Sequence, residues 1–232
     1  MIENLDAHIL FYLFGLPVNS TIFFTWIVMA VLTITSWLIT RHLTTGAHVG
    51  KLQTVLEMLV GALRQQIHDV SNDNPMKYLS FISTFFMFIA TSNLLSIIPW
   101  FKQPTASLST TVAFAFCVFI AIPYYGILNA GIKGYLKKFI DPTPVMLPLN
   151  ILSDFSSTFA LAFRLYGNML SGAVIVSVLM MLAPFVIPLP LQLLGLLTGM
   201  IQAYIFALLA IVYVSAVAPI EAFVEPDTNK GE

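Results

Sequence analysis

The sequence predicts an all-α integral membrane protein with five transmembrane helices and one interfacial amphipathic helix. The last two spans are expected to form a long, strongly tilted hairpin. Of the 232 residues, 58% are hydrophobic and only 9% are charged, whereas an average soluble domain is about 25% charged. Several stretches reach the roughly 20 apolar residues that cross a bilayer. Residues 1–232 are therefore expected to form a single membrane domain.

Charge balance and cysteine content exclude other classes of protein. Ten Lys and Arg against eleven Asp and Glu leave a net charge of −1, so no nucleic-acid partner is expected. A soluble enzyme or a disordered chain would need far more polar sequence. The single Cys117 excludes a disulfide framework. Because no GxxxxGK[ST] loop is present, we expect no nucleotide site in this chain. We also expect no catalytic residue, cofactor or metal.

The N-terminal segment does not have the pattern of a cleaved signal peptide. Residues 1–8 carry Glu3 and Asp6 where a signal peptide carries Lys or Arg. Residues 9–16 (ILFYLFGL) are too few to cross a bilayer, so a short surface helix is expected there. The first transmembrane helix is predicted over residues 20–40.

Residues 50–70 have the pattern of an amphipathic helix lying along the cytoplasmic interface. Apolar residues recur on one face at helical spacing, and charged or amide residues occupy the rest. A helix docked on a soluble partner would have the same pattern, so both interpretations stay open. The apolar face consists of Leu52, Val55, Leu56, Leu59, Val60, Leu63, Ile67 and Val70.

The last two of the remaining spans are unusually long. About 36 residues of helix would measure about 54 Å, against a hydrocarbon core of about 30 Å. Both stay apolar almost throughout, so we expect them to tilt strongly and to wrap around a curved object. An upright pair broken at Gly167 or Gly195 is the alternative. The four spans after the interfacial helix are predicted over residues 78–99, 111–132, 147–182 and 189–219.

The distribution of Lys and Arg predicts the orientation of the chain. Eight of these residues lie on one side of the predicted spans and only Lys102 lies on the other. By the positive-inside rule the N-terminus is outside and the C-terminus is cytoplasmic. The eight residues are Arg41, Lys51, Arg64, Lys77, Lys133, Lys137, Lys138 and Lys230.

A single arginine near the middle of the fourth span is the strongest functional signal. Between residues 142 and 220 only Asp154 and Arg164 are charged. An Arg at mid-bilayer costs at least about 2.5–3.5 kcal/mol to insert, so a functional role is the default interpretation. A simple pair with Asp154 is unfavourable, because ten residues of helix separate the two by about 15 Å.

Polar residues accompany Arg164 on two helical faces. In hydrocarbon such stripes need a hydrated crevice or another protein face, and two stripes that meet around one Arg indicate an ion path. The Gly195–Gly199 pair also fits close helix packing. The first stripe consists of Asn150, Ser153, Asp154, Ser157, Asn168 and Ser171, and the second of Gln192, Gly195, Thr198, Gly199, Gln202 and Tyr213.

At these residues the sequence resembles a known family. The segments FRLYGNMLSG (residues 163–172) and IQAYIFALLAIVYVS (residues 201–215) are similar to subunit a of the rotary F-type ATP synthase. The Arg-Leu-aromatic-Gly-Asn core and the Gln-Ala-aromatic-Ile-Phe run are specific motifs, and the resemblance covers the whole chain in order.

The resemblance implies a stator that holds a rotating ring of c-subunits, which is the curved object that the tilted hairpin requires. It also implies b-type peripheral stalk subunits as partners and a bacterial plasma (inner) membrane as the location. Arg164 would favour the ionised form of each ring carboxylate and block direct leakage between two half-channels, with Asn168 and Gln202 as its polar neighbours. Asp154, Asn150, Ser157, Ser171, Gln192, Thr198 and Tyr213 are the other candidate residues of the path.

This sequence departs from the family pattern at two positions. Many members have a carboxylate nine residues after the Arg and a His seven before the Gln, or the two exchanged, but here these positions are Ala173 and Gly195. Asp154, the Ser and Asn stripe or water would then replace the usual proton relay. A translocated Na⁺ would need only oxygen ligands and water, so H⁺ and Na⁺ both remain open.

Two other functions compete with the stator. A secondary transporter or solute channel often has inverted repeats around a midplane site, but the two halves of this chain show no such similarity. A structural assembly protein without an ion path is disfavoured by Arg164 and the two stripes.

The predicted orientation can be tested by cysteine labelling in intact cells and inverted vesicles, after Cys117 has been replaced. A Cys at Lys133 or Glu232 should react with an impermeant maleimide from the cytoplasmic face only, and a Cys at Gln103 from the outer face only. The reverse pattern would contradict the eight-to-one distribution of basic residues.

Overall fold

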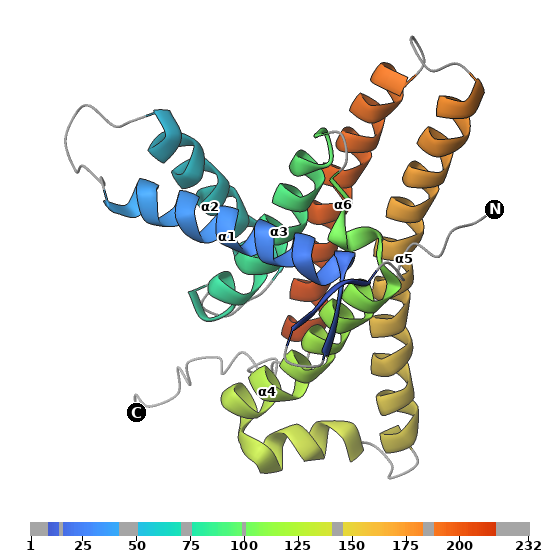
Figure 1. The fold of residues 1–232 in the computed structure, drawn as a ribbon. Coiled ribbons are helices and arrows are strands. Elements are labelled where there is room, and N and C mark those ends of the chain that lie inside the picture. The colour runs from blue at the N-terminus through green and yellow to red at the C-terminus, as the bar shows by residue number, and fades with distance from the viewer. Residues whose placement is uncertain are drawn as a thin grey trace, which may run out of the picture.

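The computed structural model describes residues 9–13, 16–41, 51–70, 76–98, 101–140, 146–182 and 188–216. In this part of the chain five helices are long and apolar enough to cross a membrane, which confirms the predicted fold class. The helices are α1 (Ser20–Arg41), α2 (Lys51–Val70), α3 (Met76–Leu95), α4 (Leu108–Ile140), α5 (Met146–Leu182) and α6 (Pro188–Ser215) (Figure 1).

A β-hairpin precedes α1, so the prediction of a short surface helix at residues 9–16 is wrong. Strand β1 (Ile9–Leu13) pairs antiparallel with β2 (Leu16–Asn19). Eight residues form only a marginal helix without packing, and Gly15 and Pro17 are the two poorest residues for a helix interior. The Ile, Phe and Tyr of this segment favour a strand.

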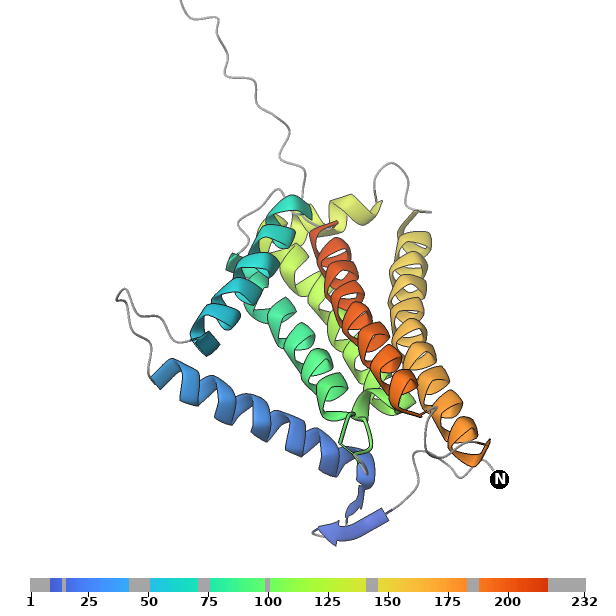
Figure 2. The same cartoon turned by 90° about the horizontal axis from the view of Figure 1, so that it is seen from above.

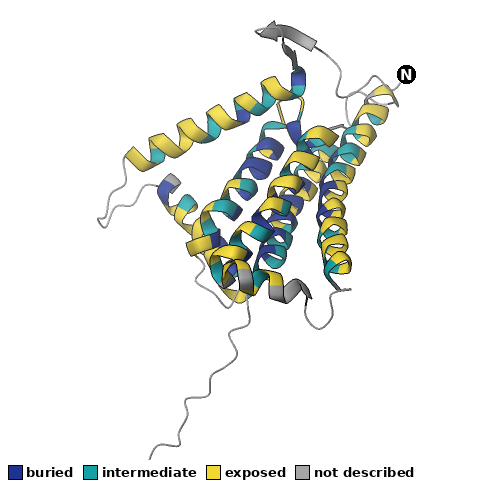
Figure 3. Cartoon of the chain, turned by 90° about the horizontal axis from the view of Figure 1, so that it is seen from below, coloured by how far each residue is buried: buried dark blue, intermediate teal, exposed yellow. Residues whose placement is uncertain are grey.

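Helices α3, α4, α5 and α6 form the bundle, with neighbouring helices in contact (Figures 1 and 2). Their facing sides are buried and their outer sides are exposed and apolar (Figure 3), as the lipid-facing side of a membrane bundle must be. Phe85, Phe114 and Phe206 bring α3, α4 and α6 together, with ring centroids 5.4–6.4 Å apart.

Helix α1 diverges from this bundle (Figure 2). Only Ser20 and Val28 of α1 are buried, and Trp26 and Trp37 are exposed. The start of α1 contacts α3 and the short 3-10 helix η1 (Pro104–Ala106), which lies in the connection between α3 and α4.

Helix α4 changes direction at Gly131, which has a non-helical backbone with φ 69° and ψ 165°. Positive φ is readily adopted only by Gly. The spanning part ends at Asn129, and the chain then runs across the end of the bundle toward α5 (Figure 1). The predicted span over residues 111–132 therefore begins later than the helix and includes the bend.

The amphipathic helix α2 packs against α3 and α6 through part of its apolar face. Leu63 and Ile67 are buried in the bundle core, whereas Val55 and Val60 are exposed. Tyr204 of α6 donates a hydrogen bond to Gln66 of α2 at 2.7 Å. The helix is thus formed where the sequence predicts it, and its position along a membrane interface stays a prediction.

Candidate functional site

Arg164 lies on α5 with its side chain exposed. Within the described part of the chain, no hydrogen bond or ion pair involves its guanidinium group. It lies near the middle of the spanning segment Leu147–Leu179, too far from either end for the side chain to reach the interface. The charge is therefore available to a group outside the described residues.

The face of α5 that carries Arg164 points away from the bundle. Leu161, Leu165 and Met169 pack into the core from a different side of the helix, while Phe163 beside Arg164 is 53% exposed. A charged group on such a face in hydrocarbon requires a counter-charge or water. The arrangement leaves room for a partner helix directly against Arg164.

Asn168 and Gln202 form the first polar contact beyond Arg164. Asn168 lies one turn after Arg164 on α5, and its Nδ2 donates to Oε1 of Gln202 on α6 at 2.6 Å. Gln202 is 1% exposed, and its Nε2 has no hydrogen-bond partner among the described residues. The two predicted stripes thus meet at this pair, with one buried N–H group left to serve another acceptor.

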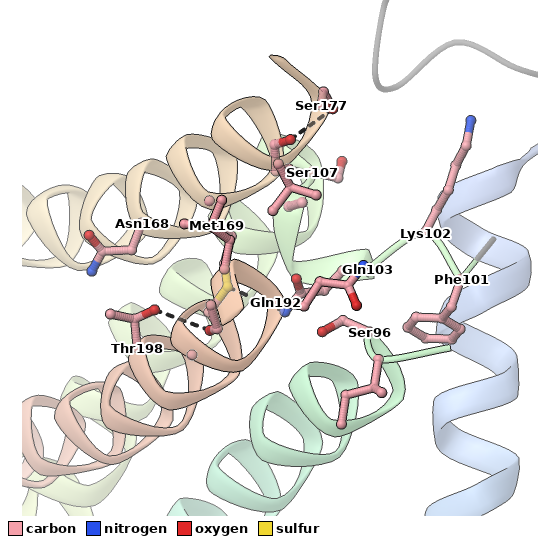
Figure 4. A pocket seen from close by; sticks show the side chains of 18 of the residues that line it. Ser96, Phe101, Lys102, Gln103, Ser107, Asn168, Met169, Ser177, Gln192 and Thr198 are labelled. Atoms are coloured by element: carbon pink, nitrogen blue, oxygen red, sulfur yellow. Dashed lines mark hydrogen bonds between the residues drawn. The ribbon is translucent and has the colours of Figure 1, made fainter. Parts of the chain in front are cut away.

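A pocket of about 440 Å³ lies between α5, α6, the start of α1 and the connection from α3 to α4 (Figure 4). Asn168 and Thr198 mark its inner side, toward Gln202, and Gln192 and Ser177 lie nearer the end of the hairpin. The connection contributes Ser96, Lys102, Gln103 and Ser107. The pocket is thus a recess with both polar and apolar walls, at the end of the bundle where the start of α1 lies.

Three of the predicted path residues line this pocket, and the others do not. Asn168, Gln192 and Thr198 are lining residues. The Ser171 hydroxyl instead donates to the Asn168 carbonyl of its own helix at 3.0 Å. The predicted residues that lie outside the pocket are Asn150, Asp154, Arg164, Ser157, Ser171, Gln202 and Tyr213.

A comparison with protein families identifies the chain. A family model described as "ATP synthase A chain" matches residues 22–215. The chain belongs to the ATP synthase subunit a family.

Curated relatives agree with this assignment. The ATP synthase subunit a of Albidiferax ferrireducens is 51% identical over 209 residues, which cover 90% of each chain. The ATP synthase subunit a 2 of Acaryochloris marina is 49% identical over 91% of each chain. The ATP synthase subunit a 1 of Chlorobaculum parvum is 52% identical over 87% of this chain and 89% of its own. As subunit a, the chain is a multi-pass membrane stator subunit of an F-type ATP synthase, and proton translocation is the general function of such subunits.

The two positions at which this subunit a departs from the family pattern both line the pocket. Ala173 of α5 and Gly195 of α6 are on its wall. Among its described lining residues there is no carboxylate and no imidazole, and Lys102 carries the one titratable side chain. Hydroxyl and amide groups therefore supply the polar lining.

Asp154 lies beside α4. Burial and the negative charge of Asp154 both raise the pKa of the Tyr135 phenol above its usual value of about 10, so the carboxylate lies near Tyr135, beyond the bend of α4. Asp154 is about 15 Å along α5 from Arg164.

Sequence reasoning missed the contribution of α3 and of the connection that follows it. Asn93 is 1% exposed inside α3, and it contacts Gln103 and Gly199. The sequence feature that could have indicated Asn93 is that it is an amide residue within the apolar run of residues 81–98. Nothing local distinguished Gln103, because its role depends on how the connection folds over the hairpin.

Replacing Asp154 with Asn should lower the pKa of Tyr135 toward its ordinary value without restoring it fully, because burial remains. Titration of a fluorotyrosine at position 135 by fluorine NMR measures this shift. The neutral phenol's contribution to stability, present below the ordinary pKa, should then be lost at a lower pH. An unchanged pKa in Asp154→Asn, or an equal decrease in Ser157→Ala, would contradict the placement of Asp154.

Proposed function

We propose that this subunit a forms two ion half-channels against a c-ring, with Arg164 between them, and couples ion movement to rotation of the ring. The observation that carries the proposal is the exposed guanidinium of Arg164 at mid-span, without a partner in the described chain. The Asn168–Gln202 pair beside it leads to a pocket whose wall includes hydroxyl and amide groups. The match to the subunit a family makes the alternative of a secondary transporter unnecessary.

The proposed role of Arg164 follows from electrostatics. Each ring carboxylate that reaches the interface would meet a permanently positive guanidinium. A positive charge within about 4–6 Å lowers the pKa of a carboxyl group, and the effect is larger where lipid excludes water. The carboxylate therefore releases its ion beside Arg164 and takes up another after it has moved on.

The two half-channels would lie at different heights along α5. The pocket beyond Asn168 would be the outer half-channel, and the stripe that includes Asn150, Asp154 and Ser157 would be the inner one. Fourteen residues separate Asp154 from Asn168, or about 21 Å of helix, and Arg164 lies between them. An ion that enters on one side must therefore travel on the ring to reach the other.

Both H⁺ and Na⁺ are compatible with the outer pocket. A proton would move through water, hydroxyl and amide groups, because the described lining residues include no acid or His. A sodium ion would use the same oxygen atoms as transient ligands in place of its hydration water. We favour the proton as the general ion of the family and leave the choice to experiment.

The orientation and the remaining partners extend the proposal. The eight-to-one distribution of Lys and Arg supports a cytoplasmic C-terminus and an outer pocket that opens outside. The similarity to the subunits a of Albidiferax ferrireducens, Acaryochloris marina and Chlorobaculum parvum supports a bacterial plasma membrane. The exposed apolar sides of α1, including Trp26 and Trp37, suit contact with lipid and with the membrane helices of b-type stalk subunits.

Replacing Arg164 with Ala should leave the complex assembled and reduce ATP-driven ion pumping by at least about a hundredfold, as loss of a preorganised charge does at catalytic sites. Arg164→Lys should restore little, because a point charge replaces a planar fork. The exposed Arg64 of α2 offers a matched control, and Arg64→Ala should pump normally. Full pumping by Arg164→Ala would refute the proposed function.

The coupling ion can be identified from ATP hydrolysis measured against Na⁺ concentration at alkaline pH, in the original complex and in Asp154→Asn. If protons move, hydrolysis should not depend on Na⁺, and Asp154→Asn should slow pumping and shift its pH profile. If Na⁺ moves, hydrolysis should be Na⁺-stimulated, and the variant should require more Na⁺. No change in either assay would leave Asp154 as a helix-start residue favourable to the helix dipole.

A further inference from the structure

A chain of side-chain amides joins three helices beside the outer pocket. Asn93 of α3 is 1% exposed, and its Nδ2 donates to the carbonyl oxygen of Gly199 on α6 at 2.5 Å. Gln103 of the following connection donates from Nε2 to Oδ1 of Asn93. The same Nε2 lies 3.3 Å from Sδ of Met169 on α5 (Figure 4). Gln103 and Asn93 thus connect α5 and α6 through α3.

Gly199 allows the closest part of this arrangement. A Cβ atom at this position would lie 2.8 Å from Cγ and Nδ2 of Asn93, which is closer than packed atoms tolerate. Helix α3 therefore approaches the backbone of α6 at a residue without a side chain. The amide of Asn93 occupies the space where any other residue would place its Cβ.

The contacts lie next to the residues of the proposed ion path. Met169 follows Asn168 directly, and Gly199 lies three residues before Gln202 on α6. The side chains of Asn168 and Gln202 are hydrogen-bonded at 2.6 Å. The contacts of Met169 and Gly199 therefore fix α5 and α6 within one helical turn of this pair. The position of the Gln202 amide relative to Arg164 depends on how α5 and α6 are placed here.

We propose that Asn93 and Gln103 are positioning residues for ion translocation, because their amide chain sets the spacing of α5 and α6 at which Asn168 meets Gln202 beside Arg164. This inference rests on the proposed function. The bond between Asn93 and the Gly199 carbonyl remains effective because both residues are buried and water does not compete for it. A displacement of about 1 Å near reacting groups can cost a hundredfold in rate, so a small change in spacing should alter pumping.

The test uses variants that remove the hydrogen bonds and one that displaces Asn93 without changing an amide. Gln103→Met keeps the length of the side chain and removes the donor, and Asn93→Ala removes both amide contacts. Gly199→Ala should push Asn93 aside. Gly61→Ala on α2 is the matched control, because nothing lies within 4 Å of a Cβ at Gly61.

Three quantities are measured on the whole complex: the amount assembled, ATP-driven pumping per assembled complex and the pH dependence of pumping. We expect Gln103→Met, Asn93→Ala and Gly199→Ala to lower pumping per complex about tenfold and to shift its pH profile. The double variant Asn93→Ala/Gly199→Ala should equal Asn93→Ala alone, since the steric conflict is then absent. Gly61→Ala should behave as the original complex.

Normal pumping per complex with an unshifted pH profile in Gln103→Met and Asn93→Ala would overturn the inference, and so would a loss explained entirely by less assembled complex. Additive losses in the double variant would show that Asn93 and Gly199 do not act through one contact. Arg164→Ala serves as the reference. If it pumps normally the proposed function fails, whereas an inactive Arg164→Ala beside a fully active Gln103→Met contradicts the positioning role alone.

Discussion

The uncompensated charge of Arg164 in the apolar helix α5 is the constraint on which the rest of the structure depends. A guanidinium at mid-bilayer is unfavourable without a counter-charge, and the described chain offers it none. A counter-charge for Arg164 must therefore come from outside the described residues. A stator subunit of a rotary ATP synthase needs such an interaction. An arginine already paired within its own chain could not interact with successive carboxylates of a rotating ring.

The helices around Arg164 divide the polar groups of the hairpin into two regions. The pocket lies beyond Asn168, toward the end of the hairpin, and Asp154 lies near the start of α5 beside Tyr135. Apolar packing by Leu161 and Leu165 occupies the inner side of α5 between them. Because of this separation, an ion could pass from one region to the other only on the proposed c-ring. The contacts of Asn93 and Gln103 would keep α5 and α6 at a fixed spacing beside the pocket.

Helical periodicity and charge were sufficient to predict the features that are local to one helix. They located Arg164 and the two polar stripes to which Asn168 and Gln202 belong. The resemblance to the family, rather than the periodicity, implied that these two residues lie beside Arg164. They could not predict that Asp154 lies near Tyr135, because the bend at Gly131 decides which part of α4 meets α5. The contacts of Gln103 were missed for the same reason, since they include Met169 of α5, which is distant in sequence. The β-hairpin is local, and it was missed because the poor helix propensity of Gly15 and Pro17 was not weighed.

The central claim is that Arg164 faces a carboxylate of a neighbouring rotor. An electron cryo-microscopy structure of the assembled complex, resolved into its rotary states, measures the distance from the Arg164 guanidinium nitrogens to the nearest ring carboxylate. We predict a separation of about 4–6 Å or less in at least one state, the range over which a charge shifts a carboxyl pKa. A guanidinium that faces lipid, or pairs with a residue of its own chain in every state, would contradict the account.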